Sequence, residues 1–145
     1  MEVTAELDAA SPPAALFAVV EDLGRYPAWL DLVTRAVPTE AVPGDPGPAW
    51  SVDLRGRLGP LARSKRLRMV RTVQEPEVRA RFERAEVDGR RHSPWVLTAD
   101  VRPTATGSHL TMSLHYGGGL FGPVLERVLV EEIERSKPRL LALLA

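Results

Sequence analysis

The segment from residue 120 to residue 144 constrains the fold of this chain more than any other. Its apolar side chains recur at the three- and four-residue spacing of an α-helix and so form one broad stripe: Phe121, Val124, Leu125, Val128, Leu129, Ile133 and Leu140. Glu132 and Ser136 fall near the middle of this stripe, because each residue turns a helix by about 100°. A long amphipathic helix that follows a series of strands predicts a helix laid into a curved sheet. The polar groups in its stripe indicate that part of the enclosed space is a site.

Length and composition bound the class of protein. The 145 residues are expected to form a single domain over positions 1–145, large enough to bury roughly two-thirds of the unfolded surface. Lys plus Arg and Asp plus Glu number 19 each, so no overall charge recruits nucleic acid or a membrane. The absence of cysteine excludes disulfides, thiolate metal sites and cysteine nucleophiles. With no signal-like start and no apolar run long enough to span a bilayer, a cytoplasmic, bacterial-type protein is expected.

The first part of the chain reads as one strand and one helix. Residues 3–7 alternate as a short strand with Val3, Ala5 and Leu7 on one side. Ser11 is predicted as the N-cap of a helix that has Pro12 in its first position and ends near Gly24.

A second short helix and a loop are expected next. Pro27 can open a helix that carries Trp29, Leu30 and Val33. Residues 38–48 are rich in Pro and Gly, which predicts a surface loop.

Alternation of apolar and polar residues predicts the remaining strands. Their ranges are approximately 50–57, 61–73, 78–83, 95–101 and 110–116. Short turns separate them at Gly59-Pro60, Glu75-Pro76, Asp88-Gly89 and residues 103–108. Because strands joined by short turns are antiparallel, the fold class is α+β.

Two motifs give this pattern a resemblance to a known superfamily. The stretch from Asp22 to Trp29 is similar to the Tyr-Pro-x-Trp segment after the first helix of many bacterial members, and the stretch from Gly118 to Pro123 is similar to the start of the last helix in an actinobacterial subgroup. In element order the whole chain resembles the START-like, helix-grip superfamily, also called SRPBCC, which includes polyketide cyclases/dehydrases and lipid-transfer domains. The resemblance implies about seven antiparallel strands that grip the C-terminal helix, with a hydrophobic cavity between them.

The inward-facing residues define the expected cavity, which should measure several hundred Å³ as small-molecule sites do. Its wall is predicted to consist of Trp29, Trp50, Leu54, Leu67, Met69, Phe82, Trp95, Leu97, Met112 and Tyr116. Its lid is predicted to consist of Leu125, Val128, Leu129 and Ile133. Arg71, Glu132 and the Tyr116 hydroxyl are the expected orienting groups.

Arg71 and Glu132 carry the sharpest hypothesis. Strand parity turns Arg71 inward with Leu67 and Met69, and its place before Glu75-Pro76 resembles that of an inward arginine in the aromatase/cyclase members. Those members have a serine where this chain has Met69. If both charged groups are enclosed, they should meet across the cavity, since an isolated buried charge is costly. The alternatives are a β-bulge that exposes Arg71 and a surface position for Glu132.

Metal and phosphate sites are not predicted. His109 and His115 are six residues apart on one strand, roughly 20 Å, and His92 belongs to another strand. No sequence of the nucleophile-elbow type surrounds a serine. The glycines at 117–119 lack the Lys-Ser or Lys-Thr pair of a phosphate loop, so they are interpreted as freedom for a tight reversal.

A run of basic residues lies between Leu54 and Gln74. It has no acid and contains Arg55, Arg57, Arg63, Lys65, Arg66, Arg68 and Arg71. Alternation sends Arg66 and Arg68 outward, so this run reads first as a solvated sheet face. The alternative is transient contact with an anionic headgroup, a membrane surface or an acidic carrier protein. Few aromatic residues interleave with it, which argues against nucleic acid.

Three functions are compatible with these features. The first is binding of a hydrophobic or amphipathic small molecule, lipid or polyketide-like, with no cofactor. The second is a polyketide cyclase/dehydrase-type enzyme in which Arg71 holds an enolate and Tyr116 or Glu132 moves protons. The third is an interaction or regulatory protein, toxin-like, with a vestigial cavity. The oligomeric state is left open.

Overall fold

The fold is a curved antiparallel sheet closed by a long helix, as predicted. The computed structural model describes residues 2–58, 61–117 and 122–145. In these residues the sheet has seven strands in the order β1-β7-β6-β5-β4-β3-β2, and every neighbouring pair is antiparallel. The strands are β1 (Glu2–Ala9), β2 (Val33–Thr39), β3 (Ala49–Leu58), β4 (Leu61–Glu75), β5 (Arg79–Arg84), β6 (Trp95–Thr104) and β7 (Gly107–Tyr116). The turn expected at Gly59-Pro60 and the expected helix start at residues 118–121 lie outside the described residues.

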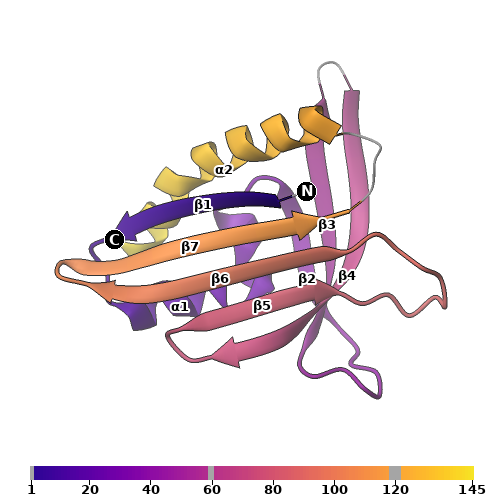
Figure 1. The fold of residues 1–145 in the computed structure, drawn as a ribbon, viewed down its shortest axis with the longest axis horizontal. Helices are drawn as coiled ribbons and strands as arrows, with labels where there is room; N and C mark the ends of the chain where they lie inside the picture. Colours follow the sequence, from indigo (N-terminus) through magenta and orange to yellow (C-terminus); the bar gives the residue numbers. More distant parts are fainter. Residues whose placement is uncertain (1, 59–60, 118–121) are drawn as a thin grey trace.

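The long helix α2 (Gly122–Leu144) closes the sheet. It contacts β1 and β3, which come from opposite parts of the sheet order, so the sheet wraps around the helix. Figure 1 shows α2 running beside β1 and β7, while the pair β3 and β4 turns steeply across them. The α+β, helix-grip class predicted from the sequence is confirmed by this arrangement.

The edge strand β2 corrects the sequence prediction. Residues 33–39 were expected to end a helix at Val33 and to enter a loop at Pro38, but they pair with β3, with Pro38 opposite Trp50. Proline lacks an N–H and is tolerated on an edge strand, where the missing donor would face solvent. Pro38 therefore signals the edge of the sheet.

The two helices after β1 are shorter than predicted. α1 (Pro13–Val20) has Pro12 as its N-cap, and Ser11 donates its hydroxyl to the Leu144 carbonyl at 3.1 Å instead of capping. The second helix is a 3-10 turn, η1 (Leu23–Ala28), that begins before Pro27 and is capped by the Asp22 carboxylate. Ser11 thus links the start of α1 to the end of α2, a contact that no local pattern indicates.

The connection from β5 to β6 is longer than the predicted hairpin. Residues 85–94 join these strands, and Gly89 has a φ of 72°, in the left-handed region that favours glycine. The Asp88-Gly89 signal marks a turn within this loop and not a two-residue hairpin.

Candidate functional site

A partly open, apolar pocket lies between α2 and the part of the sheet formed by β1, β7 and β6. The volume open to the centre of a water molecule is about 80 Å³, which is room for several water-sized groups. This volume is smaller than the several hundred Å³ expected from the sequence. It is lined by Val3, Ala5, Glu6, Leu7, Tyr26, Trp29, Leu30, Leu32, Leu97, Leu110, Met112, Leu114, Leu129, Ile133, Ser136, Lys137 and Leu140.

Large aromatic rings explain why the pocket is small and lies on one side. Phe82 on β5 packs edge-on against Trp50, with ring centroids 5.7 Å apart, and against Tyr26 at 6.2 Å. All three side chains are buried, so they fill the space under β3, β4 and β5. The strands β1 and β7 present smaller aliphatic side chains, which leave room below α2.

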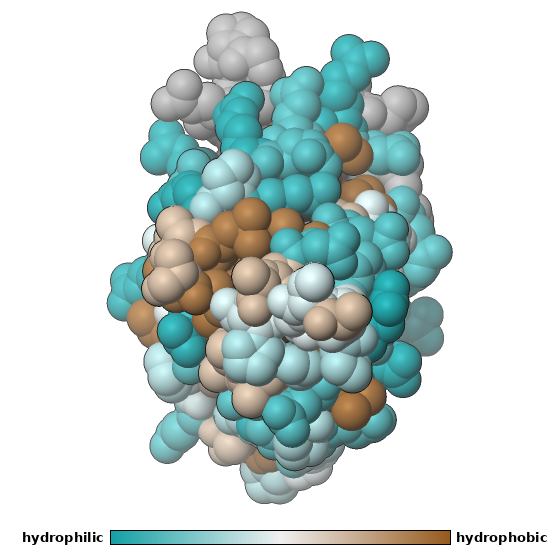
Figure 2. Space-filling view, turned by 90° about the vertical axis from the view of Figure 1, so that its left-hand side faces the viewer, coloured by the Kyte–Doolittle hydropathy of each residue, from teal (hydrophilic) through white to brown (hydrophobic). Residues whose placement is uncertain are grey.

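The pocket wall is in contact with water. Seven of its apolar residues are half-buried: Ala5, Leu7, Leu30, Leu97, Met112, Leu114 and Ile133. Figure 2 views the face at the left of Figure 1, where α2 ends, and shows hydrophobic side chains gathered near its middle among hydrophilic ones. Covering such side chains with an apolar ligand is favourable, at about 25 cal/mol per Å² of surface removed from water.

The polar side-chain groups of the pocket wall are turned to the protein. The buried Tyr26 hydroxyl donates to the Val20 carbonyl at 2.8 Å, and its enclosure raises the pKa of this phenol far above the usual value. The Ser136 hydroxyl donates to the Ile133 carbonyl at 2.6 Å. The indole Nε1 of Trp29 is fully enclosed and has no hydrogen-bond partner among the described residues. The wall consequently presents almost only carbon to a guest.

Charged side chains occur at the rim. Lys137 on α2 pairs with Glu134, with Nζ 2.7 Å from Oε1. Glu6 on β1 lies 3.2 Å from Nε2 of His109, whose Nδ1 lies 2.8 Å from Asp8. Hydrogen bonds to Asp8 and Glu6 raise the pKa of His109 above its ordinary value.

The structure places the predicted cavity residues in three groups. Those that line the pocket are Trp29, Leu97, Met112, Leu129 and Ile133. Those that belong to the packed core, or contact it, without lining the pocket are Trp50, Leu54, Leu67, Met69, Phe82, Trp95 and Tyr116. Val128 is half-buried outside the lining, and the side chain of Leu125 lies outside the described residues.

The expected polar end of the cavity is not formed. Arg71 donates to the Glu21 carbonyl at 3.0 Å and to Gln74, and its guanidinium lies 5.9 Å from the Trp50 ring centroid. Glu132 pairs with Arg135 on the same helix at 3.2 Å. A β-bulge follows Arg71, with the register shift between Arg71 and Val73, but Arg71 itself stays opposite Phe82 and is half-buried at the end of α1, so the alternative of an exposed Arg71 is wrong as well. The predicted Arg71–Glu132 pair is wrong.

Tyr116 also lies away from the pocket. Its ring packs against Trp95, with centroids 5.5 Å apart, and burial raises the pKa of its phenol. Its role as an orienting group for a ligand in this pocket is therefore not supported.

Sequence reasoning missed much of the lining because the signal was not local. Val3, Ala5 and Leu7 alternate on one side of β1, which was evident, but nothing in the sequence placed β1 beside β7. Lys137 was not singled out in the sequence, although it follows Ser136, which lies in the apolar stripe, and it lines the pocket.

The basic run makes more contacts within the protein than predicted. Arg66 pairs with Asp53 at the surface, as a solvated face requires. Arg68 is buried: Nη2 lies 2.7 Å from Asp45, and both side chains are less than a tenth exposed. Hydrogen bonds from Arg68 and from the Val42 N–H lower the pKa of Asp45. The expectation that Arg68 is solvated is wrong, because the loop that carries Asp45 covers it.

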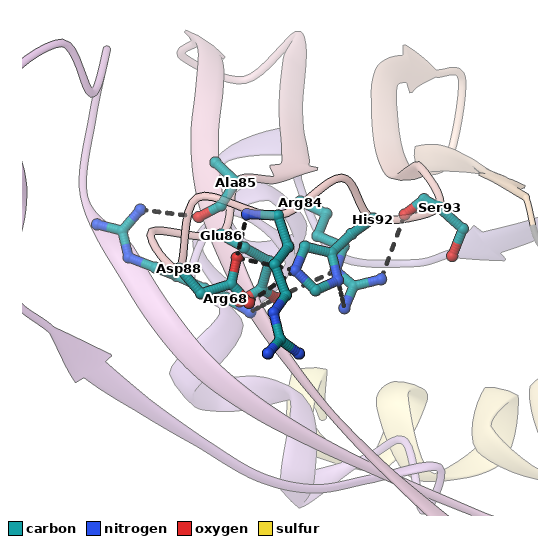
Figure 3. Close-up of polar contacts among 8 residues, drawn as sticks. Arg68, Arg84, Ala85, Glu86, Asp88, His92 and Ser93 are labelled. Atoms are coloured by element: carbon teal, nitrogen blue, oxygen red, sulfur yellow. Dashed lines mark hydrogen bonds and ion pairs between the residues drawn. The ribbon is translucent and has the colours of Figure 1, made fainter.

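A second polar cluster surrounds the end of β5 (Figure 3). Arg84 donates to Glu86 at 3.0 Å and to the Ser93 carbonyl at 3.3 Å, and its Nη2 lies 3.3 Å from Nδ1 of His92. His92 Nε2 lies 2.8 Å from Asp88. Glu86 also accepts the backbone N–H of Arg68. This cluster holds the loop of residues 85–94 against β4, where β5 stops pairing.

Lys65 is a further basic residue of this region. Its Nζ lies 5.6 Å from the Trp95 ring centroid, and burial lowers its pKa. Contact of the basic run with a membrane or a carrier protein stays a prediction.

Within residues 2–58, 61–117 and 122–145, no group of three His, Asp or Glu side chains is placed to hold a metal ion. Among the same residues, no helix is long and apolar enough to cross a membrane.

Comparison with known proteins assigns the chain a family. The family model described as "Polyketide cyclase / dehydrase and lipid transport" matches residues 1–144. A search of curated proteins gives no match.

Solved structures share the fold at low sequence identity. A START superfamily protein from Mycobacterium smegmatis has a TM-score of 0.73 at 14% identity, covering 99% of this chain and 96% of that one. Protein CV1439 from Chromobacterium violaceum has a TM-score of 0.71 at 14% identity, with 99% and 96% covered. The di-domain ARO/CYC StfQ from the steffimycin biosynthetic pathway has a TM-score of 0.69 at 17% identity; the match covers 99% of this chain and 50% of that one.

Proposed function

This chain belongs to the polyketide cyclase / dehydrase and lipid transport family, and on that premise we propose that it binds an apolar or amphipathic small molecule in the pocket between β1, β7 and α2. The observation that carries the proposal is the pocket wall, which is apolar yet open to water at seven side chains. A folded domain gains by covering such a surface, and a guest of matching size covers it.

An enzymatic role has less support. A cyclase of the kind expected from the sequence needs Arg71 and either Tyr116 or Glu132 around one cavity, and none of the three lines the pocket. Arg71 and Glu132 each have other partners, the Glu21 carbonyl for Arg71 and Arg135 for Glu132.

The test is a pair of tryptophan substitutions on β6. Leu97 lines the pocket, and Val96 is its neighbour with its side chain on the other face of the sheet. An environment-sensitive apolar fluorophore should bind the native protein with at least micromolar affinity, about −8 kcal/mol. Leu97→Trp should abolish that signal and Val96→Trp should retain it. Equal binding to both variants would mean that the probe binds a patch on the surface and not the pocket.

A second measurement identifies the natural guest. Native mass spectrometry of the freshly purified protein should show a bound small molecule that Leu97→Trp does not retain.

A further inference from the structure

Lys137 is the charged group at the mouth of the pocket that a guest can reach. We propose that the ligand is a small amphiphile with a single anionic group, a carboxylate, which Lys137 binds at the rim while an apolar tail occupies the pocket. This inference rests on the proposed function and adds the class and orientation of the ligand.

The interior requires an apolar tail. The Tyr26 and Ser136 hydroxyls already donate to carbonyls of the protein, and the Trp29 Nε1 is enclosed by its neighbours. An ionised group deep in the pocket would lose its water, and the enclosed Trp29 N–H is the single side-chain donor without a partner among the described uncharged polar groups of the wall, which is too little to replace the hydration of a charge. The polar end of the ligand must therefore lie at the rim.

Glu6 does not compete for that position. Val3, Ala5 and Leu7 face the pocket, so strand alternation turns the Glu6 side chain to the opposite face of β1. Its carboxylate accordingly lies 3.2 Å from His109, which is in the outward file of β7. Among the described lining residues, this leaves Lys137 as the charged residue on the pocket side of its own element, one turn from the lining residues Ile133 and Leu140.

Lys137 can exchange its partner. It pairs with Glu134 three residues earlier on the helix, and the Glu134 side chain is 62% exposed. An ion pair this open to solvent contributes little to stability. A ligand carboxylate that is anchored by its own apolar tail can therefore replace Glu134 as the partner of Lys137. The anchored carboxylate also gains a charge-assisted hydrogen bond at a site with an apolar floor.

The pocket volume sets the tail length. About 80 Å³ for the centre of a water molecule corresponds to a tail on the order of six to eight carbon atoms, or one aromatic ring. A medium-chain or aromatic monocarboxylate fits these limits.

The test compares three probes of equal length by isothermal titration calorimetry: octanoate, octan-1-ol and octylamine. The native protein should bind octanoate about fivefold more tightly than octan-1-ol, as expected for one charge-assisted hydrogen bond at a half-exposed site. Octylamine should bind most weakly of the three.

Three variants assign the effect to Lys137. Lys137→Met keeps an apolar stem at the rim and should reduce octanoate affinity to that of octan-1-ol, which itself should not change. Glu134→Gln removes the competing carboxylate and should tighten octanoate alone. Glu131→Gln should leave all three probes unchanged, because Glu131 is exposed on the same helix and does not line the pocket. Circular dichroism confirms that each variant is folded.

The possible failures are distinguishable. If octan-1-ol binds as tightly as octanoate, or if Lys137→Met leaves octanoate affinity unchanged, the carboxylate inference is overturned while the pocket proposal stands. If octylamine binds best, or if Glu131→Gln tightens octanoate as much as Glu134→Gln does, Lys137 is not the anchor. If no probe binds the native protein and Leu97→Trp changes nothing, the proposed function itself fails.

Discussion

His109 is the residue whose ionisation bears most directly on the edge of the sheet. It reaches from β7 to Asp8 and Glu6 on β1, and its side chain is only 11% exposed while its two partners are largely in solvent. The hydrogen bonds raise its pKa, and Arg102 opposes them. Protonated His109 therefore adds a charge-assisted contact between β7 and the edge strand β1, which forms one wall of the pocket.

The raised pKa of His109 predicts a pH-dependent stability. A group with a raised folded-state pKa stabilises the fold fully below its unfolded value, about 6.5, and this contribution is lost as the pH rises through the folded value. The free energy of unfolding should thus differ between the native protein and His109→Gln near pH 6 and converge near pH 9. Because Asp8 and Glu6 are exposed, the difference should stay below about 1 kcal/mol. Urea titrations at the two pH values measure it, and a difference that grows with pH would contradict the assignment.

The hydroxyl of Tyr26 gives a second residue-scale prediction. It is buried and donates to the Val20 carbonyl at the end of α1. Tyr26→Phe keeps the ring but leaves this carbonyl without the donor, which should cost about 1–3 kcal/mol of unfolding free energy. Thr34→Val is the matched control, since it removes an exposed hydroxyl that donates to the Asp53 carbonyl, and it should change stability by less than about 0.5 kcal/mol. Equal losses of unfolding free energy for the two variants in urea denaturation would contradict this prediction.

At the scale of elements, the C-terminal end of α2 is held by several side-chain contacts. Arg139 pairs with Asp31 and donates to the Ala28 carbonyl at 3.1 Å, and the Leu144 carbonyl accepts the Ser11 hydroxyl. Leu140 is buried beneath these contacts. The end of α2 is thus fixed against both α1 and the segment between η1 and β2.

Two adjacent leucines test this packing. Leu140→Ala should lower the unfolding free energy by about 2–5 kcal/mol, because the side chain is 2% exposed and its removal enlarges the space beneath α2. Leu141→Ala, next along the helix but 39% exposed, should cost less than about 0.5 kcal/mol beyond helix propensity. Chemical denaturation of both variants is the measurement. A large loss from Leu141→Ala would indicate that this face is covered by another surface.

At the scale of the whole molecule, a guest in the pocket joins elements from both ends of the chain. β1 and α2 both line it, so ligand binding should stabilise the folded domain as a unit. At a free ligand concentration of 100 times Kd the gain is about 2.7 kcal/mol. Thermal unfolding with saturating octanoate should show a raised Tm for the native protein and Val96→Trp, and none for Leu97→Trp. An equal shift in all three would indicate binding elsewhere.

The candidate site was only partly predictable. Leu97 and Met112 were placed correctly, because alternation along one strand specifies which side chains share a face. Arg71 and Glu132 also follow their local periods, yet Arg71 binds the Glu21 carbonyl at the end of α1 and Glu132 pairs with a neighbour on its own helix. Arg68 obeys its parity and is nevertheless buried, since a loop folded over it.

The sequence by itself determined β1 and the series of strands from β3 to β7, the antiparallel class and the apolar face of α2, but not the edge strand β2. These properties follow from covalent geometry, because periods of 2 and 3.6 residues and short turns act within a few residues of one another. Only the tertiary structure decided where the pocket lies, how large it is and that Lys137 stands at its rim. A cavity is the space left between side chains from distant elements, here the rings of Tyr26, Trp50 and Phe82 against the aliphatic β1 and β7. The pattern of neighbouring residues in the sequence does not show this difference in side-chain volume between the two parts of the sheet.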